Sequence, residues 1–371
     1  MKICVLLLYL LVAAYALPAQ SLTTEPAAPR PGASITIHLT ADKTATPQLS
    51  AYLLTGGAPA ARPIELVYEG GEWSGVVATT RAVRSIWFWL SGEGVERRGY
   101  PLPLRRANGR PVKGAMGALA EMHYSYVHLF CAPADAAAAM ACLQEEFEQY
   151  PASKKEADFF RLYAQAARRI GDAAALQEVR ARIEALAGRR RADEASLLLA
   201  YDLAKTTGAV DVAGRLEARI RDRYPAGRWR RDELAQAFYR ERDPAAREEL
   251  FRQYRTLATE EEAATLSFFA AELAGSYGLT DHRKFKAYEQ LISDPRTKAG
   301  LYYNLARQLA GGGPDLAARE PERALELARQ SLQLLEEVRN NPQHRPSYLT
   351  TQQWQAQLKR EQATYADTYA L

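Results

Sequence analysis

The sequence predicts an α+β multidomain chain, with an N-terminal antiparallel β-sandwich followed by an all-α array of paired helices. Three observations support this fold class. From about residue 21 to residue 110, apolar residues alternate with polar ones, which is the period of half-buried strands. From residue 115 to residue 371 they recur every three or four positions, which is the period of a helix face. Within this second part a helix-ending pattern recurs along the chain.

Length and composition limit the class of protein. The chain has 371 residues, of which 47% are hydrophobic and 25% are charged, the balance of an ordinary soluble globular protein. Disordered, collagen-like and disulfide-dense chains are therefore excluded. At roughly 100–200 residues per domain, the length allows two or three domains. The net charge of +4 is too small to indicate a nucleic-acid partner by itself.

Residues 1–16 have the features of a secretory signal peptide. Lys2 supplies the positive charge, residues 3–14 form an apolar run, and Ala14-Tyr15-Ala16 is a small-x-small cleavage site. The run is shorter than the roughly 20 apolar residues that span a bilayer. An uncleaved N-terminal anchor is the alternative. We therefore expect an exported protein of the periplasm or cell envelope, without a transmembrane segment after signal cleavage.

The β region is expected over residues 21–110. Turn residues such as Gly70-Gly71 separate short alternating runs, which favours hairpins in an antiparallel sandwich. About 90 residues also suit one immunoglobulin-like module. The residues expected to face its core include Ile35, Ile37, Leu39, Ile86, Phe88 and Leu90.

Trp87 and Trp89 share the opposite face of one expected strand. Two neighbouring indole rings could form a sugar-binding platform. The favoured alternative is that this face packs against the helical part of the chain.

The helical region is expected over residues 115–371, and its pattern repeats. Four alanines, 167, 204, 274 and 306, lie in similar helical contexts with spacings of 37, 70 and 32 residues. A small residue there would let helices approach closely, and a glycine soon afterwards would supply a left-handed C-cap. The glycines that follow the four alanines are Gly171, Gly208, Gly278 and Gly311.

A period of 32–37 residues with two helices per unit indicates a degenerate tetratricopeptide-like solenoid. Such arrays hold peptides or other domains on a concave face, so we expect a protein or peptide partner. The alternative is a spacer that packs only against its neighbouring domains. Our candidate partner-binding residues on the concave face are Tyr163, Tyr201, Tyr302 and Tyr303.

Catalytic, cofactor and metal motifs are not found in the sequence. It contains no nucleophile elbow, Walker loop, zinc signature, dinucleotide fingerprint or C-x-x-C pair. His123 and His128 are five residues apart, so they would not share a helix face as a zinc pair does. The arginine runs at 189–191 and 228–231 are interpreted as solvated helix ends and loops, not as a nucleic-acid surface. We predict no cofactor, no metal and no nucleic-acid partner.

Cys131 and Cys142 would remain after the signal peptide is removed. Cys131 lies beside the turn at Pro133, whereas Cys142 would lie about nine residues into the next helix, roughly 13 Å away. A disulfide needs Cα atoms within about 7 Å of each other. We therefore expect two buried free thiols.

The segment Thr364–Leu371 has the pattern of the first half of another repeat helix. It carries no glycine, proline or basic residue that would cap a helix, whereas terminal repeats of a solenoid are normally capped. We therefore expect a helical array that is truncated at its C-terminus. A frayed amphipathic terminus is the alternative.

The order of these features resembles the N-terminal region of exported bacterial thioredoxin-like thiol–disulfide oxidoreductases. The sequence that carries the resemblance is the junction Pro111-Val112-Lys113-Gly114-Ala115 and the run Tyr365–Leu371, together with the sandwich and the helical repeats. In that family the chemistry lies in a C-terminal C-x-x-C, which no position here matches. The resemblance implies an accessory region without catalytic residues, whose partner would be a downstream thioredoxin-like domain.

Two functions follow as hypotheses. The first is an exported, non-catalytic scaffold whose tetratricopeptide-like repeats bind or position a protein partner. The alternative is the N-terminal accessory region of an envelope thioredoxin-like disulfide reductase, active in cell redox homeostasis, whose catalytic domain lies beyond Leu371.

Overall fold

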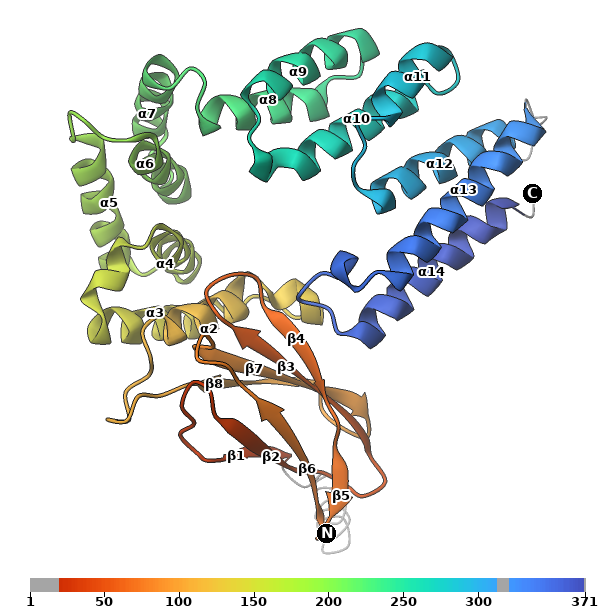
Figure 1. Ribbon diagram of the computed structural model, residues 1–371. Coiled ribbons are helices and arrows are strands. Elements are labelled where there is room, and N and C mark those ends of the chain that lie inside the picture. The colour runs from red at the N-terminus through yellow and green to blue at the C-terminus, as the bar shows by residue number, and fades with distance from the viewer. Residues whose placement is uncertain (1–19, 312–319, 370–371) are drawn as a thin grey trace, which may run out of the picture. The chain divides into compact units, whose positions relative to one another are not determined.

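Alternating apolar residues build two four-stranded antiparallel sheets near the N-terminus (Figure 1). The computed structural model describes residues 20–311 and 320–369, so the expected signal peptide at 1–16 lies outside the described residues. The first sheet has the order β1 (Ser21–Glu25), β2 (Ser34–Thr40), β6 (Glu72–Ala78) and β5 (Val67–Glu69). The second has the order β4 (Ala60–Ile64), β3 (Thr46–Leu54), β7 (Ser85–Glu93) and β8 (Arg98–Pro103).

The core of the sandwich contains the residues that the alternation predicts. Ile35, Ile37, Ile86, Phe88 and Leu90 are all completely buried. The β5–β6 turn holds Gly70 and Gly71 at positive φ, which fits the tight hairpin expected there. The structure thus confirms the predicted β-sandwich.

Helices follow the last strand, and thirteen α-helices are found in the described ranges. The first of them are α2 (Ala115–Tyr124), α3 (Ala136–Gln149), α4 (Ala157–Ile170), α5 (Ala173–Ala187), α6 (Glu194–Thr207), α7 (Val210–Arg223) and α8 (Arg228–Arg240). The others are α9 (Pro244–Leu257), α10 (Ala263–Tyr277), α11 (His282–Glu289), α12 (Pro295–Leu309), α13 (Pro321–Asn340) and α14 (Thr351–Tyr369). Short 3₁₀ turns lie at η1 (Val127–Phe130), η2 (Pro151–Lys155), η3 (Glu260–Glu262) and η4 (Pro342–His344). This order confirms the predicted change from a sandwich to an all-α region.

Local sequence explains where many helices begin. Aspartate side chains accept a hydrogen bond from the third helical N–H at the starts of α3, α6, α9, α11 and α12. Thr259 and Glu262 form a reciprocal capping box ahead of α10. These caps satisfy backbone donors that would otherwise have no partner.

The chain divides into two compact units. The first comprises Met1–Ala181 with the short segment Ser347–Thr350, and the second comprises Arg182–Pro346 with Thr351–Leu371. The boundary lies inside α5 and does not coincide with the change from strand to helix. In the first unit, the N–H of Ala61 donates to the carbonyl of Ser347 at 2.8 Å.

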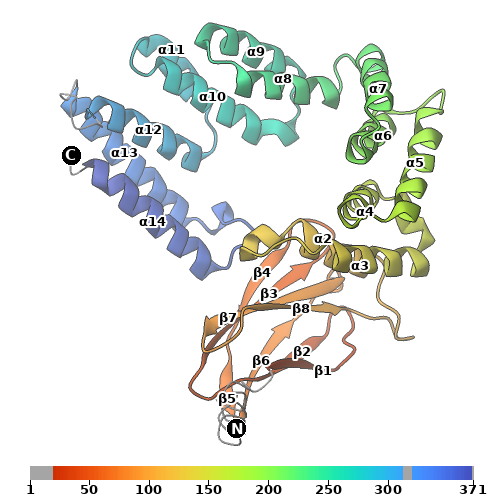
Figure 2. The same cartoon turned by 180° about the vertical axis from the view of Figure 1, so that it is seen from behind.

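In the first unit α2 lies across the second sheet, as Figures 1 and 2 both show. Trp87 is 7% exposed, and Trp89 stacks on Phe130 with a centroid distance of 4.4 Å. The two indoles are therefore covered by α2 and η1, as the favoured interpretation of the sequence predicts. They do not form an exposed sugar-binding platform.

In the second unit, neighbouring helices pack as pairs: α6 with α7, α8 with α9, α10 with α11, and α12 with α13. α10 also packs against α12, and α13 against α14. Figure 2 shows these pairs side by side along the unit. The second unit therefore has surfaces that form where one helix pair meets the next.

The four aligned alanines are fully buried, which agrees with close helix packing at 167, 204, 274 and 306. Gly171 and Gly208 have φ of 76° and 75° and end α4 and α6 in the predicted left-handed conformation. Gly278 differs, because its φ is −57°. A Cβ at Gly278 would lie 2.4 Å from Leu305 Cδ2. Glycine is required at 278 by packing, so the predicted left-handed cap is wrong there.

Both described cysteines are free. Cys142 is half-buried, and burial raises the pKa of its thiol to about 11. Cys131 is exposed and has a φ of 53°, so the expectation of two buried thiols is wrong for Cys131. Cys131 is the left-handed C-cap residue of η1, and its side chain is left in solvent.

Candidate functional site

A groove of about 510 Å³ lies between α10 and α12, and we call it the α10–α12 groove. It is lined by Phe268, Ala271, Glu272, Gly275, Ser276, Thr297, Gly300, Leu301, Asn304, Leu305 and Gln308. Its volume falls within the range of ligand sites in proteins. All of these residues belong to the second unit.

Small residues keep the groove open. A Cβ at Gly275 would lie 3.6 Å from Leu301 Cδ1, and one at Gly300 would lie 3.5 Å from the Tyr365 hydroxyl. Both distances are ordinary van der Waals contacts, so the two glycines are not required by packing. Their effect is to leave free space that a larger side chain would fill.

Two exposed aromatic rings lie at the α10–α12 groove and beside it. Phe268 lines the groove and is 38% exposed, and Tyr239 of α8 is 57% exposed. Their ring centroids are 5.8 Å apart. Phe269 is instead fully buried, because successive residues on a helix point about 100° apart. Exposed aromatic rings of this kind are typical anchors for an apolar side chain of a partner.

Asn304 and Gln308 supply polar groups on α12. They are exposed and one helical turn apart, so they share a face of the helix. Within the described residues, neither carboxamide makes a side-chain hydrogen bond to another group. Each carries a carbonyl acceptor and an NH₂ donor. Such a pair can hydrogen-bond to both the N–H and C=O groups of an extended main chain.

The charge in the groove is largely compensated. Glu272 is its acidic residue, and its carboxylate lies 3.6 Å from the Arg247 guanidinium. Asn304, Gln308, Ser276 and Thr297 are neutral. The groove therefore favours an uncharged segment over a strongly acidic or basic one.

Two of the four candidate tyrosines are buried. Tyr163 is 6% exposed and its hydroxyl lies 3.2 Å from Glu178 Oε2; burial, followed by this carboxylate, raises its pKa to about 12. Tyr302 is 5% exposed and its hydroxyl donates to Glu289. Burial, followed by the Glu289 hydrogen bond, raises the pKa of Tyr302 too. Tyr163 and Tyr302 therefore present little surface to a partner.

The other two candidates are half-buried, and their rings have partners. Tyr201 packs edge-on against Trp229 with a centroid distance of 4.6 Å. Tyr303 stacks almost parallel on Tyr365, with centroids 4.2 Å apart and an angle of 7°. The structure places the four tyrosines on four separate contacts instead of one surface patch. Their role in partner binding stays a prediction.

The sequence pattern does not by itself point to the residues that line the α10–α12 groove or to the exposed rings of Phe268 and Tyr239. Asn304 and Gln308 lie directly beside the predicted apolar positions of their helix, and their spacing of four residues was a usable signal. Phe268-Phe269 offered another, since two successive aromatics on a helix cannot both face one core. Which of the two is exposed depends on the neighbouring helix.

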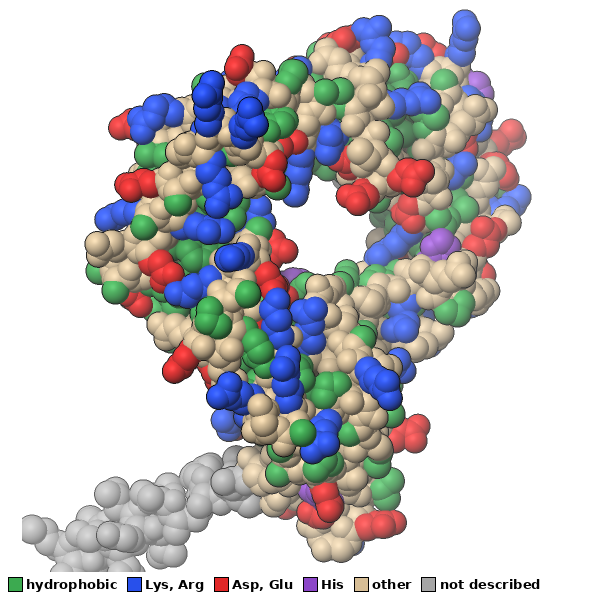
Figure 3. Space-filling view, turned by 60° about the vertical axis from the view of Figure 1, so that its left-hand side comes forward, with side chains coloured by type: hydrophobic (Ala, Val, Ile, Leu, Met, Phe, Trp, Pro, Cys, Tyr) green, Lys and Arg blue, Asp and Glu red, His purple; other side chains and the backbone are tan. Residues whose placement is uncertain are grey.

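Side chains of the arginine run 228–231 form local ion pairs, and backbone carbonyls of the run 189–191 accept hydrogen bonds. Arg230 and Arg231 each form an ion pair at 2.6 Å, with Glu233 and Glu262 respectively. Arg219 donates to the carbonyls of Ala187 and Arg189, each at 2.5 Å, and so closes the end of α5. On the face in view in Figure 3, acidic side chains lie among the basic ones. These contacts support the interpretation as helix ends and loops.

His123 and His128 have separate environments. His123 packs edge-on against Trp87 at 4.8 Å, and burial lowers its pKa. The Nδ1 of His128 is 2.9 Å from the carbonyl oxygen of Ser125. Within residues 20–311 and 320–369, no three His, Cys, Asp or Glu side chains are grouped so that they could hold a metal ion.

Comparisons with known proteins do not assign a family. No protein-family model matches the chain, and no curated protein matches it either. None of the helices in the described part of the chain has both the length and the apolar character needed to cross a membrane.

Proposed function

We propose that the chain is an exported, non-catalytic scaffold of the periplasm or cell envelope whose tetratricopeptide-like helices bind a protein partner. The observation that supports this best is the α10–α12 groove, with its small lining residues, its exposed rings of Phe268 and Tyr239, and two carboxamides that have no side-chain partner among the described residues. Binding needs no catalytic group, and the groove combines apolar contact area with groups that recognise a main chain.

The partner segment proposed for the groove is extended and uncharged, and it carries one apolar side chain. That side chain would pack against Phe268, and its neighbouring peptide groups would pair with Asn304 and Gln308. Because the two carboxamides have no side-chain partner in the described part of the chain, pairing breaks no hydrogen bond described there. Because Ala271, Gly275 and Gly300 are among the lining residues, the segment can lie close to the helices there.

The test is binding of a peptide selected from a random library with the full chain as bait. In the double variant Asn304→Ala/Gln308→Ala, loss of two peptide hydrogen bonds should weaken binding by about tenfold or more. Gln144→Ala is the matched control, because Gln144 is an exposed carboxamide on α3, outside the groove. Unchanged affinity in the double variant, or equal loss in the control, would refute the groove as the binding site.

The alternative function is the accessory region of an envelope thioredoxin-like disulfide reductase. The observation that favours it is the order of a β-sandwich followed by helices, which the resemblance implies. The coding sequence after the Leu371 codon provides the test. An in-frame domain with a C-x-x-C motif supports this alternative, and a stop codon contradicts it.

A further inference from the structure

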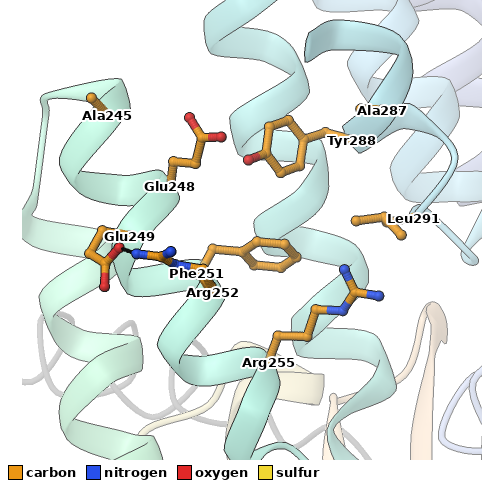
Figure 4. Close-up of a pocket in the computed structure, with 9 residues that line it drawn as sticks. All are labelled: Ala245, Glu248, Glu249, Phe251, Arg252, Arg255, Ala287, Tyr288 and Leu291. Carbon is orange, nitrogen blue, oxygen red and sulfur yellow. Dashed lines mark ion pairs between the residues drawn. The ribbon is translucent and has the colours of Figure 1, made fainter.

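A second cavity lies between α9 and α11, and we call it the α9–α11 pocket. Its volume is about 580 Å³, and it shares no lining residue with the α10–α12 groove. It is lined by Ala245, Glu248, Glu249, Phe251, Arg252, Arg255, Ala287, Tyr288 and Leu291 (Figure 4). Both helices belong to the second unit.

Both acidic groups of the pocket have cationic partners within the protein. Oε2 of Glu248 accepts hydrogen bonds from Lys284 Nζ at 2.7 Å and from the Tyr277 hydroxyl at 3.0 Å. The hydrogen bond from Lys284 is the main reason that the pKa of Glu248 is lowered. Glu249 forms an ion pair with Arg252, one turn along α9. Neither carboxylate therefore needs a cationic ligand to balance its charge.

Arg255 is the charged lining residue that lacks such a partner. It is exposed, and among the described residues it has neither an ion pair nor a side-chain hydrogen bond. Figure 4 shows its guanidinium extending beyond Phe251 toward Leu291. With Glu248 balanced by Lys284 and Glu249 by Arg252, the pocket keeps one uncompensated positive charge. An anionic ligand matches this charge.

Apolar side chains lie beside the guanidinium. Phe251 packs edge-on against Tyr288, with ring centroids 5.8 Å apart, and Leu291 lies next to them at the end of the pocket. The Tyr288 hydroxyl is directed toward Glu248, so its ring faces the pocket. The surface next to Arg255 therefore suits an apolar group, and the ligand must be both apolar and anionic.

We propose that the α9–α11 pocket binds the C-terminal residue of a polypeptide that ends in an apolar side chain. The free α-carboxylate pairs with Arg255, whose planar guanidinium can donate two hydrogen bonds to it. The apolar side chain packs against the partly buried Tyr288 and Leu291, because Phe251 is itself only 5% exposed. The cavity of about 580 Å³ is larger than a single side chain needs, and the preceding residues of a polypeptide would occupy the rest of it, which a small carboxylate cannot do.

The proposal is tested with the full chain and fluorescein-labelled Gly-Ser-Gly-Phe, followed by fluorescence anisotropy. The peptide with a free carboxylate should bind. Its C-terminal amide should bind at least about tenfold more weakly, because it lacks the charge that pairs with Arg255. High salt should weaken binding of the free acid. Equal binding of acid and amide, or no binding of the acid, overturns the proposal.

Variants separate this pocket from other sites. Arg255→Gln should lower the affinity for the peptide acid about tenfold or more. Arg255→Lys should lower it less, because lysine keeps the positive charge but lacks the planar guanidinium that donates two hydrogen bonds. Arg240→Gln is the matched control, since Arg240 is also exposed but does not line the pocket. An Arg255→Gln variant that binds like the unmodified chain overturns the proposal.

The source of the carboxylate is distinguished by competition. 3-Phenylpropanoate has the ring and the carboxylate but no peptide group, so it should compete much more weakly than the peptide acid. Competition at equal concentration would refute a polypeptide ligand. The Asn304→Ala/Gln308→Ala variant should bind the peptide acid normally, so failure of the proposed groove function and failure of this proposal are distinguishable.

Discussion

Glu121 is a half-buried carboxylate in α2 whose pKa is raised from 4.5 to about 7. Burial is the main cause, Asp158 raises it further, and Arg84 acts in the opposite direction. A raised carboxyl pKa means that the folded state holds a proton that the unfolded state has lost. Glu121 therefore reduces stability as pH rises from about 4.5 through 7.

We predict that Glu121→Gln stabilises the first unit above pH 7 and has little effect near pH 4, below the ordinary pKa of 4.5. The gain at pH 8 should be about 1 to 2 kcal/mol, after allowance for the partial exposure of the carboxylate. Thermal unfolding at the two pH values measures it. Glu148→Gln is the control, because Glu148 is an exposed acid on the neighbouring helix α3. If Glu121→Gln changed stability by the same amount at both pH values, the prediction would be contradicted.

At the scale of elements, a close contact between α2 and α4 in the first unit depends on a missing side chain. A Cβ at Gly117 in α2 would lie 2.3 Å from Cζ of Phe159, a buried ring of α4. Gly214 in α7 is also within a helix, but a Cβ there would meet nothing within 4 Å. A side chain at position 117 would therefore meet a neighbouring helix, whereas one at position 214 would not.

Alanine at these two positions should have opposite effects. Gly117→Ala should destabilise by about 1–3 kcal/mol, because the Phe159 ring must move. Gly214→Ala should stabilise by up to about 1 kcal/mol, because alanine favours the helix and restricts the unfolded chain. Urea unfolding followed by circular dichroism compares them. Stabilisation by both substitutions would show that α2 and α4 do not pack as described.

The elements could be predicted from the sequence more completely than their contacts. Alternation identified the buried face of β2 and β7, and the helical period identified the buried alanines, because both depend on local periodicity. Glycines often end helices, which predicts a left-handed cap at Gly278, but the side chain that a Cβ there would meet is Leu305, from another helix. Exposure of Phe268, Asn304 and Gln308 depends on neighbouring helices in the same way. Sites built between elements therefore required the structure.

The whole molecule contains two units with separate cores. One buried cluster fills the sandwich around Ile37 and Phe88, and another joins α8 to α13 around Phe269 and Leu273. Regions with their own buried cores commonly open as separate cooperative units. Because the boundary lies within α5, the helical region as a whole need not unfold in one step.

We predict that core substitutions act within their own unit. Leu273→Ala should remove about 2–5 kcal/mol from the second unit, and Ile37→Ala a similar amount from the first. Hydrogen exchange followed by mass spectrometry should show lost protection in α8–α13 for the former and in the strands for the latter. Uniform loss of protection along the chain in either variant would mean that the molecule unfolds as one unit.

The stacked rings of Tyr303 and Tyr365 give the second unit a helix contact that fluorescence could detect. Two phenol rings held parallel at 4.2 Å are placed for carbon–carbon coupling when each loses one electron and one proton. The product, dityrosine, is a fluorescent crosslink, and here it would join α12 to α14. A one-electron oxidant would thus convert a non-covalent helix contact into a permanent one, and the emission that appears would measure how often the two helices are together.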